Sequence, residues 1–148
     1  MSIYGSIDIS RQGMSVQRQR MKLIASNIAN LQTTQTPEGG PYRRRLLVVE
    51  AVPQDNFAAQ LNRFTDEPEN DILGVRATRV QLDNSPLVLK YEPDHPHANA
   101  RGYVAYPNIN PATEMVDMIN TQRSYEANVS AVRSARQMWT NAVEMLRA

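Results

Sequence analysis

The sequence contains no cysteine, so neither a disulfide framework nor thiolate chemistry is available to it. Hydrophobic residues make up 41% and aromatic residues only 6% of the 148 residues, which is little material for a compact core. No apolar run approaches the roughly 20 residues of a membrane-spanning helix. Arg11, Arg18 and Arg20 also interrupt any apolar core of a secretory signal. We therefore expect no membrane span, and export without a Sec signal peptide if the protein leaves the cytoplasm.

The charge is small in total and unevenly distributed. A net charge of +1 gives the whole chain no strong attraction for nucleic acid or a membrane surface. Residues 1–45 carry seven Lys/Arg and two Asp/Glu, a net charge of +5. Residues 46–110 carry five and nine, a net charge of −4, and residues 111–148 are neutral. Any electrostatic attraction is therefore local to one part of the chain.

Two terminal segments carry apolar residues at heptad spacing. The first predicts a helix from about Ile3 to Leu31, about 43 Å long, and the second a helix from about Pro111 to Leu146, about 52 Å long. Asn110 can cap the second helix, and Glu114 and Asp117 suit the positive end of its dipole. Polar residues interrupt both stripes at Ser10, Gln17, Gln122 and Arg136. The stripes therefore predict helix packing of moderate strength.

The fold class that these helices predict is mainly α with a small β-containing middle. The two terminal helices should pack as an antiparallel coiled-coil pair with extended loops between them. We expect an N-terminal helical layer over 1–35, an extended ribbon and β-containing region over 36–110, and a C-terminal helical layer over 111–148. A pair alone leaves part of each stripe uncovered, so such helices favour further neighbours. The expected subunit-packing residues are Ile7, Met14, Met21, Ile24, Ile28 and Leu31 in the first helix and Met115, Met118, Tyr125, Val129, Val132, Trp139, Val143 and Leu146 in the second.

The middle of the chain alternates strand-like and loop-like stretches. Runs rich in β-branched and apolar residues predict strands over Arg43–Val52, Asp71–Asp83 and Pro86–Pro93. Pro53–Asn70 is polar and acidic and predicts a mobile loop or a short helical turn. Asp94–Pro111 is rich in proline and should run extended along a surface.

Two clusters raise the question of chemistry. Asp94, His95 and His97 could begin a metal site, but no third and fourth ligands are marked, so we expect solvated histidines and neither metal nor cofactor. Arg43–Arg45 could contact nucleic acid, but only Tyr42 supplies a neighbouring aromatic ring. A solvated or partner-facing edge is the expected role of this basic run. The sequence shows no catalytic triad and no phosphate-binding loop, so it does not indicate an enzyme.

Two long strings carry a resemblance to a known family. The string "QRQRMKLIASNIANLQTTQTPEGGPYRRR" (17–45) resembles the N-terminal signature of bacterial flagellar basal-body rod proteins, and "TPEGGPYRR" within it resembles the proximal-rod FlgC type. The string "HPHANARGYVAYPNINPATEMVDMINTQRSYEANV" (95–129) is similar to the second signature of that type. The residues that match the family motifs are Asn27, Asn30, Thr33, Thr34, Pro37, Gly39, Gly40, Tyr42, Tyr103, Pro107, Asn108, Asn110, Glu126 and Asn128.

The resemblance implies a structural subunit of the rod. The terminal helices would form the inner tubular layer around the export channel, and the unfolded chain would be exported by the flagellar type III apparatus. The implied partners are other rod proteins, the MS ring and export gate components, and further copies of the same chain. The positive residues 1–45 and the negative residues 46–110 would then attract each other between subunits. The alternative is a helical secretion effector or adaptor that folds on a single target.

Overall fold

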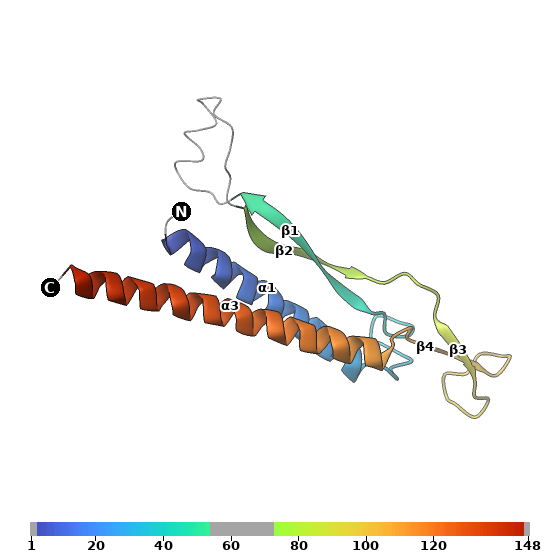
Figure 1. The fold of residues 1–148 in the computed structure, drawn as a ribbon. Coiled ribbons are helices and arrows are strands. Elements are labelled where there is room, and N and C mark those ends of the chain that lie inside the picture. Colours follow the sequence, from blue (N-terminus) through green and yellow to red (C-terminus); the bar gives the residue numbers. More distant parts are fainter. Residues whose placement is uncertain (1–2, 54–72, 147–148) are drawn as a thin grey trace, which may run out of the picture. The chain divides into compact units, whose positions relative to one another are not determined.

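The computed structural model of the chain describes residues 3–53 and 73–146. Two long helices enclose, in sequence, a small region of strands, as the sequence predicts (Figure 1). The elements follow the order α1 (Ile3–Ala29), β1 (Arg45–Pro53), β2 (Leu73–Leu82), β3 (Val88–Tyr91), β4 (Tyr103–Tyr106) and α3 (Pro111–Met145). Of the expected loop over Pro53–Asn70, all but Pro53 lies outside the described residues.

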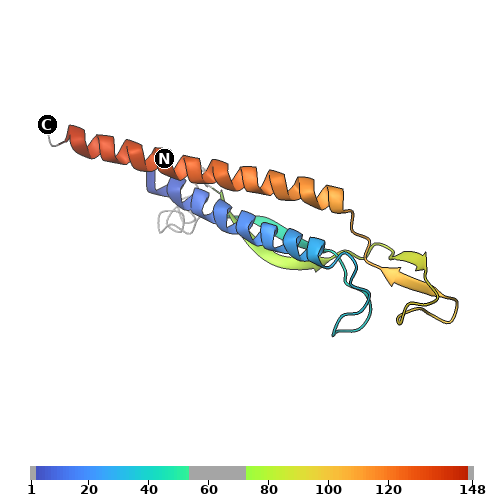
Figure 2. The same cartoon turned by 90° about the horizontal axis from the view of Figure 1, so that it is seen from below.

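Contacts divide the chain into two compact units. The terminal unit comprises Met1–Arg18, Val49–Thr78 and Arg123–Ala148, and the central unit comprises Gln19–Val48 and Arg79–Gln122. Figure 2 shows α1 and α3 each as one continuous helix. The boundary between the units falls within each of them, after Arg18 in α1 and after Gln122 in α3. Each helix therefore contributes one segment to each unit.

Helix α1 ends at Ala29, two residues before the predicted Leu31, because polar side chains compete with its last turn. The Asn30 side chain donates from Nδ2 to the carbonyl of Ser26 over 2.8 Å. The backbone then tightens, since the amide of Leu31 bonds to the carbonyl of Ile28, three residues earlier. The carbonyls of Ser26 and Ile28 in the last turn therefore find donors inside the chain.

The polar stretch after α1 folds back on itself, although the sequence indicated an extended ribbon. The amide of Tyr42 donates to the carbonyl of Thr33 over 3.0 Å, and the amide of Thr36 donates to the carbonyl of Gly40 over 2.8 Å. Gly39 and Gly40 adopt φ values of +91° and +77°, which only glycine reaches without strain. We call residues 33–42 the polar loop. It returns the chain to the end of α1 and so positions Tyr42 there.

Helix α3 begins where the sequence predicts and ends at Met145, one residue before the predicted Leu146. The Oδ1 atom of Asn110 accepts a hydrogen bond from the amide of Ala112 over 2.9 Å, the geometry of an N-cap. The amide of Glu114 closes the first turn by donating to the carbonyl of Asn110 over 3.1 Å. The cap thereby fixes the position of Glu114 in the first turn.

Two separate two-stranded sheets lie between the helices in sequence. β1 pairs with β2, and the amide of Asp83 just after β2 donates to the carbonyl of Arg44 just before β1, so the start of one strand lies beside the end of the other. β3 pairs antiparallel with β4, with Val88 opposite Tyr106 and Tyr91 opposite Tyr103. The three predicted strands exist. β2 and β3 lie within their predicted ranges, whereas β1 begins two residues later and ends one residue later than predicted.

β4 corrects the expectation that residues 94–111 are merely extended. Asn99 organises the turn before this strand, because its Oδ1 accepts hydrogen bonds from the amides of Arg101 and Tyr103 over 2.9 and 3.0 Å. Gly102 lies within the turn at a φ of +78°. The Tyr91 and Tyr103 rings then meet edge to face at 5.3 Å. Asx-type turn chemistry at Asn99 is the sequence signal that indicates this turn.

The buried core is small and partly polar. Among the described residues the buried hydrophobic side chains are Val16, Ile24, Tyr42, Val104 and Ala135. Asn27 and Glu114 are each only 1% exposed, more deeply buried than most of these. None of the described helices is both long enough and apolar enough to cross a membrane. Hydrogen bonds and ion pairs therefore contribute much of the stability of the central unit.

Candidate functional site

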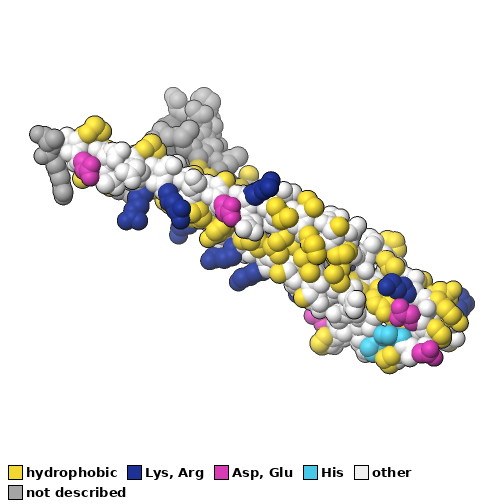
Figure 3. Space-filling model, turned by 60° about the horizontal axis from the view of Figure 1, so that its bottom comes forward, with side chains coloured by type: hydrophobic (Ala, Val, Ile, Leu, Met, Phe, Trp, Pro, Cys, Tyr) yellow, Lys and Arg dark blue, Asp and Glu magenta, His cyan; other side chains and the backbone are white. Residues whose placement is uncertain are grey.

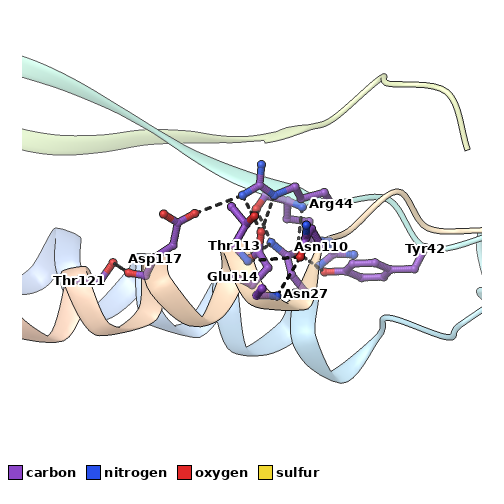
Figure 4. Close-up of polar contacts among 10 residues, drawn as sticks. Asn27, Tyr42, Arg44, Asn110, Thr113, Glu114, Asp117 and Thr121 are labelled. Atoms are coloured by element: carbon purple, nitrogen blue, oxygen red, sulfur yellow. Dashed lines mark hydrogen bonds and ion pairs between the residues drawn. The ribbon is translucent and has the colours of Figure 1, made fainter. Parts of the chain in front are cut away.

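A cluster of polar side chains joins the end of α1, the residues just before β1 and the start of α3 (Figure 4). We call Asn27, Tyr42, Arg44, Glu114 and Asp117 the polar clamp. All five belong to the central unit. Asn27 lies in the last turn of α1, Tyr42 at the end of the polar loop, Arg44 just before β1, and Glu114 and Asp117 in the first turns of α3.

Asn27 uses both halves of its amide group. Its Nδ2 donates to the backbone carbonyl of Arg45 and to Oε2 of Glu114, each over 3.1 Å. Its Oδ1 accepts from the hydroxyl of Tyr42 over 3.1 Å and from the backbone amide of Arg45 over 3.0 Å. A carboxylate could not donate in this way, so the buried position requires an amide.

Glu114 carries a charge that Arg44 compensates. The Nε atom of Arg44 donates to Oε1 of Glu114 over 2.6 Å, and its Nη2 lies 2.6 Å from the same oxygen. The Nη2 atom also donates to Oδ2 of Asp117 over 3.3 Å. A buried carboxylate is tolerated only when it is paired and hydrogen-bonded, and both oxygens of Glu114 meet this condition.

Tyr42 extends the clamp toward the polar loop. Its hydroxyl lies 3.1 Å from Oγ of Ser26, in addition to its bond to Asn27. The Arg45 guanidinium lies over its ring, 5.4 Å from the centroid, a cation–π distance. The clamp side chains thus use their hydrogen-bonding groups on one another, and their arrangement serves to hold α1, the start of β1 and α3 together.

The basic run Arg43–Arg45 is engaged within the chain rather than presented as a free patch. Arg44 belongs to the clamp, Arg45 stacks on Tyr42, and Nη1 of Arg43 donates to the carbonyl of Asp83 over 3.3 Å. This engagement gives no support to a nucleic-acid surface.

Asp83 has a pKa held below its ordinary value. The backbone amide of Ser85, 2.9 Å from Oδ1, is the main cause, and the Ser85 hydroxyl adds to it. The nearby charges of Arg44 and Arg43 act in the same direction. Because the folded pKa is lowered, Asp83 contributes stability above its unfolded pKa, and this contribution is lost as the pH falls through the folded pKa.

The two histidines are tied to the polar loop and to each other. Nδ1 of His97 lies 2.8 Å from the Thr34 hydroxyl, and the amide of His97 donates to Nδ1 of His95 over 3.1 Å. The neighbouring Tyr106 hydroxyl donates to Glu92 over 2.8 Å, a bond that raises the pKa of Tyr106. Within residues 3–53 and 73–146, no group of three or more His, Cys, Asp or Glu side chains is arranged to hold a metal ion.

The expected packing residues of α1 are partly covered within the single chain. Ile24 is buried, and so is Val16, which the heptad pattern did not include. The half-buried members are Ile7, Met14, Met21 and Ile28 in the helix and Leu31 just after it. Their role in packing between subunits stays a prediction.

The deepest face of α3 is offset from the predicted stripe. Its buried residues are Glu114, Thr121 and Ala135, each one position before a member of one predicted heptad set. The half-buried members of the predicted stripes are Met118, Tyr125, Val129, Val132 and Val143. The exposed members are Met115, Trp139 and Leu146, at 55%, 46% and 88%. Polar and small residues carry no hydrophobic signal, so a count of apolar spacings missed the three deepest positions.

The family-motif residues have several structural roles. Asn27 and Tyr42 belong to the clamp, and Asn110 caps α3. The polar loop or the turn before it holds Asn30, Thr33, Thr34, Pro37, Gly39 and Gly40. Tyr103 lies in β4, Pro107 is buried, Asn108 donates to the Ser85 hydroxyl over 3.4 Å, and Glu126 and Asn128 lie on α3.

The sequence pattern does not identify Arg44 and Glu114 as partners in an ion pair. Glu114 and Asp117 were expected to act only through the dipole of α3, and Arg44 only as part of a basic edge. The i, i+3 spacing of the two acids on one helix face is the signal that suits a shared basic partner.

Two family models match the ends of the chain. The model described as "Flagella basal body rod protein" matches residues 7–34, and the model described as "Flagellar basal body rod FlgEFG protein C-terminal" matches residues 100–145. The first match contains Asn27 and the second contains Glu114 and Asp117. The clamp therefore joins the two matched segments directly through the Asn27–Glu114 hydrogen bond. Tyr42 and Arg44, which lie outside both matches, add one contact to Asn27 and one to Glu114.

Curated relatives match the chain over nearly its whole length. The flagellar basal-body rod protein FlgC of Borreliella burgdorferi is 38% identical over 99% of each chain. The FlgC protein of Bacillus subtilis is 36% identical over 98% of this chain and 99% of its own. The FlgC protein of Aquifex aeolicus is 38% identical over 97% of each chain.

Proposed function

Because the chain belongs to the FlgC family of flagellar basal-body rod proteins, we propose that its two terminal helices join it to its neighbours in the rod. The protein is a structural subunit of the basal-body rod and is not an enzyme. It is located in the flagellar basal body, where it assembles with other rod components. The proposal concerns how the helices accomplish that assembly.

The helices pair antiparallel, as in a coiled coil. The hydrogen bond of 3.1 Å between Asn27 and Glu114 supports this arrangement, because it links the last turn of α1 to the first turn of α3. The Arg44–Glu114 ion pair holds the strand-bearing middle to the same point. The clamp then sets the register of the pair, since only one alignment of the helices brings Asn27 opposite Glu114.

The terminal segments 1–35 and 111–148 form the inner tubular layer around the export channel, and residues 36–110 lie between them in sequence. The support is the exposed apolar surface of α3, where Met115, Val116 and Ile119 are each more than half exposed. An isolated soluble chain gains nothing from such exposure, whereas a tube covers it with adjacent subunits. The expected packing residues on both stripes contribute to the same contacts.

The partners of this layer are other rod proteins, the MS ring and export gate components, and further copies of the chain. The chain reaches them unfolded through the flagellar type III apparatus. The interruption of the first segment by Arg11, Arg18 and Arg20 supports this route. The alternative of a secretion effector or adaptor is not favoured, because the near-full-length relatives are rod proteins.

Deletion and complementation in the bacterium of origin test the proposal. Cells that lack the chain should build basal bodies without a complete rod and should be non-motile. The wild-type chain should restore both, and its electron density in isolated basal bodies should lie in the helical layer next to the channel. Complete rods in the deletion strain, or density for the chain outside that layer, would contradict the proposal.

A further inference from the structure

A groove in the terminal unit lies between the first half of α1 and α3. It has a volume of about 500 Å³ and is lined by Arg11, Gln12, Met14, Ser15, Arg18 and Tyr125. All six residues belong to the terminal unit. Met14 and Tyr125 supply apolar walls, and the two arginines are seven positions apart, two turns along the same face of α1.

The donors in this groove are incompletely used. Arg11 pairs with Asp8 over 2.7 Å, but its side chain is 75% exposed. Arg18 makes no ion pair or hydrogen bond within the described part of the chain. The hydroxyls of Ser15 and Tyr125 likewise make no hydrogen bond to the described residues. Lys and Arg side chains follow one edge of the helices in Figure 3. A guanidinium beside two hydroxyls that have no partner among the described residues is suited to a carboxylate.

The chain itself contains a segment of matching charge. Residues 54–72, which lie outside the described residues, carry five Asp/Glu and one Arg, a net charge of −4. Four of these carboxylates fall within the run "TDEPEND" (65–71) at Asp66, Glu67, Glu69 and Asp71. The described residues between 46 and 110 carry four acidic and four basic side chains, so the whole negative excess of that part lies in 54–72.

We propose that the groove at Arg11 and Arg18 receives the acidic segment 65–71 of a second copy of this chain. The inference rests on the proposed assembly of the chain with its own copies and names the surfaces that meet. Each copy presents one groove and one acidic segment, so the contact is heterologous and repeats from one copy to the next. Met14 and Tyr125 supply apolar contacts beside the ion pair that Arg18 would form.

Binding of a synthetic peptide tests the charge recognition. The full-length chain is titrated with a labelled peptide of sequence FTDEPENDI, and with a control peptide in which the four carboxylates are replaced by amides. We expect the acidic peptide to bind, to bind more weakly as salt is added, and the amide peptide not to bind. Arg18→Glu should weaken binding about tenfold, whereas Arg133→Glu, an exposed charge on α3 outside the groove, should change it little. Equal binding of the two peptides, or no binding of either, overturns the proposal.

Cross-linking in assembled rods tests whether the contact joins two copies. The absence of native cysteine allows Ser15→Cys in one copy and Glu67→Cys in a second, differently tagged copy without background. A bismaleimide should join the two tags in isolated basal bodies, and Ser130→Cys in place of Ser15→Cys should give little product. Rods that contain both copies but give no product overturn the contact and leave the rod function intact. A third sample carries Ser15→Cys and Glu67→Cys in the same copy. If only this sample gives a product, and the product lies within one chain, the segment binds the groove of its own chain and the proposal is also overturned. Failure of the unsubstituted chain to enter rods overturns the proposed function together with this inference.

Discussion

At the scale of single residues, the central unit depends on a buried carboxylate and a buried amide. Glu114 bonds to Asn27, 87 positions away, and to Arg44, 70 positions away. Neither partner can be identified from local sequence, because heptad spacing, capping and dipole rules concern neighbours within a few turns. The sequence could therefore predict that Glu114 lies in the first turn of α3, but not that it is buried.

Glu114→Ala should destabilise the chain by about 2–4 kcal/mol. The change leaves Arg44 with only the weaker contact to Asp117 and removes one acceptor from Asn27, and loss of one partner of a buried pair is costly. Chemical denaturation of the purified chain measures the effect. Glu144→Ala, an exposed change on the same helix, should stay within about 0.5 kcal/mol. Equal stability of the two variants would show that the clamp is not a fastening.

Replacement of both His95 and His97 by Gln should leave metal content and rod assembly unchanged. The glutamine amides can still hydrogen-bond to the polar loop, and the described residues form no three-ligand cluster around the histidines. Elemental analysis of tag-free protein and a motility assay provide the two measurements. A bound ion that disappears in the double variant would establish a metal site at this loop.

At the scale of elements, the apolar spacing predicted both helices to within two residues at each end. It did not predict which face of α3 is buried, since Glu114, Thr121 and Ala135 have little or no hydrophobic signal. β4 was missed because its turn depends on the Asn99 side chain rather than on a run of β-branched residues. Periodicity thus identifies elements, while polar side chains decide how they end and which face is covered.

Val132→Asp should abolish rod assembly, while Ser130→Asp should not. Val132 is half-buried on the predicted stripe of α3, and Ser130, two positions away, is exposed. Burial of an unpaired carboxylate at a packing seam costs several kcal/mol, whereas a substitution at a solvent-exposed position usually costs less than about 0.5 kcal/mol. Both chains should be made and exported alike, so rod formation, or motility as its substitute, compares their packing directly. Normal assembly of the Val132 variant would remove the support for this stripe as a subunit seam.

At the scale of the whole molecule, the described residues bury few apolar side chains, and several large apolar side chains of α3 face solvent. The low hydrophobic content predicted a small core, and the resemblance over residues 17–45 and 95–129 indicated the family. The division into two compact units, each crossing both helices, was not predictable, because it depends on long-range contacts that no motif encodes.

Amide hydrogen exchange on the dilute, monomeric chain should show frayed ends of both helices. The polar interruptions at Ser10, Gln17, Gln122 and Arg136 and the exposed α3 surface motivate this expectation. Protection should be greatest near Asn27 and Glu114, where the clamp restrains the backbone. Strong protection along both helices in a proven monomer would count against assembly as the source of their stability.

The bond between Asn27 and Glu114 also closes a ring of 87 residues of chain. Loop-closure entropy grows only with the logarithm of ring size, so the cost of closure is about 4 kcal/mol and changes slowly with length. A ten-residue insertion anywhere inside the ring would add only about 0.1 kcal/mol to that cost. The length of the enclosed chain is therefore nearly free to vary, and a short tag placed between β1 and β2 should leave closure of the ring almost unaffected. The position of Glu114 late in the chain has a further effect. A chain that emerges progressively from its N-terminus can complete the central unit only after residue 114 has emerged, when most of the length is available.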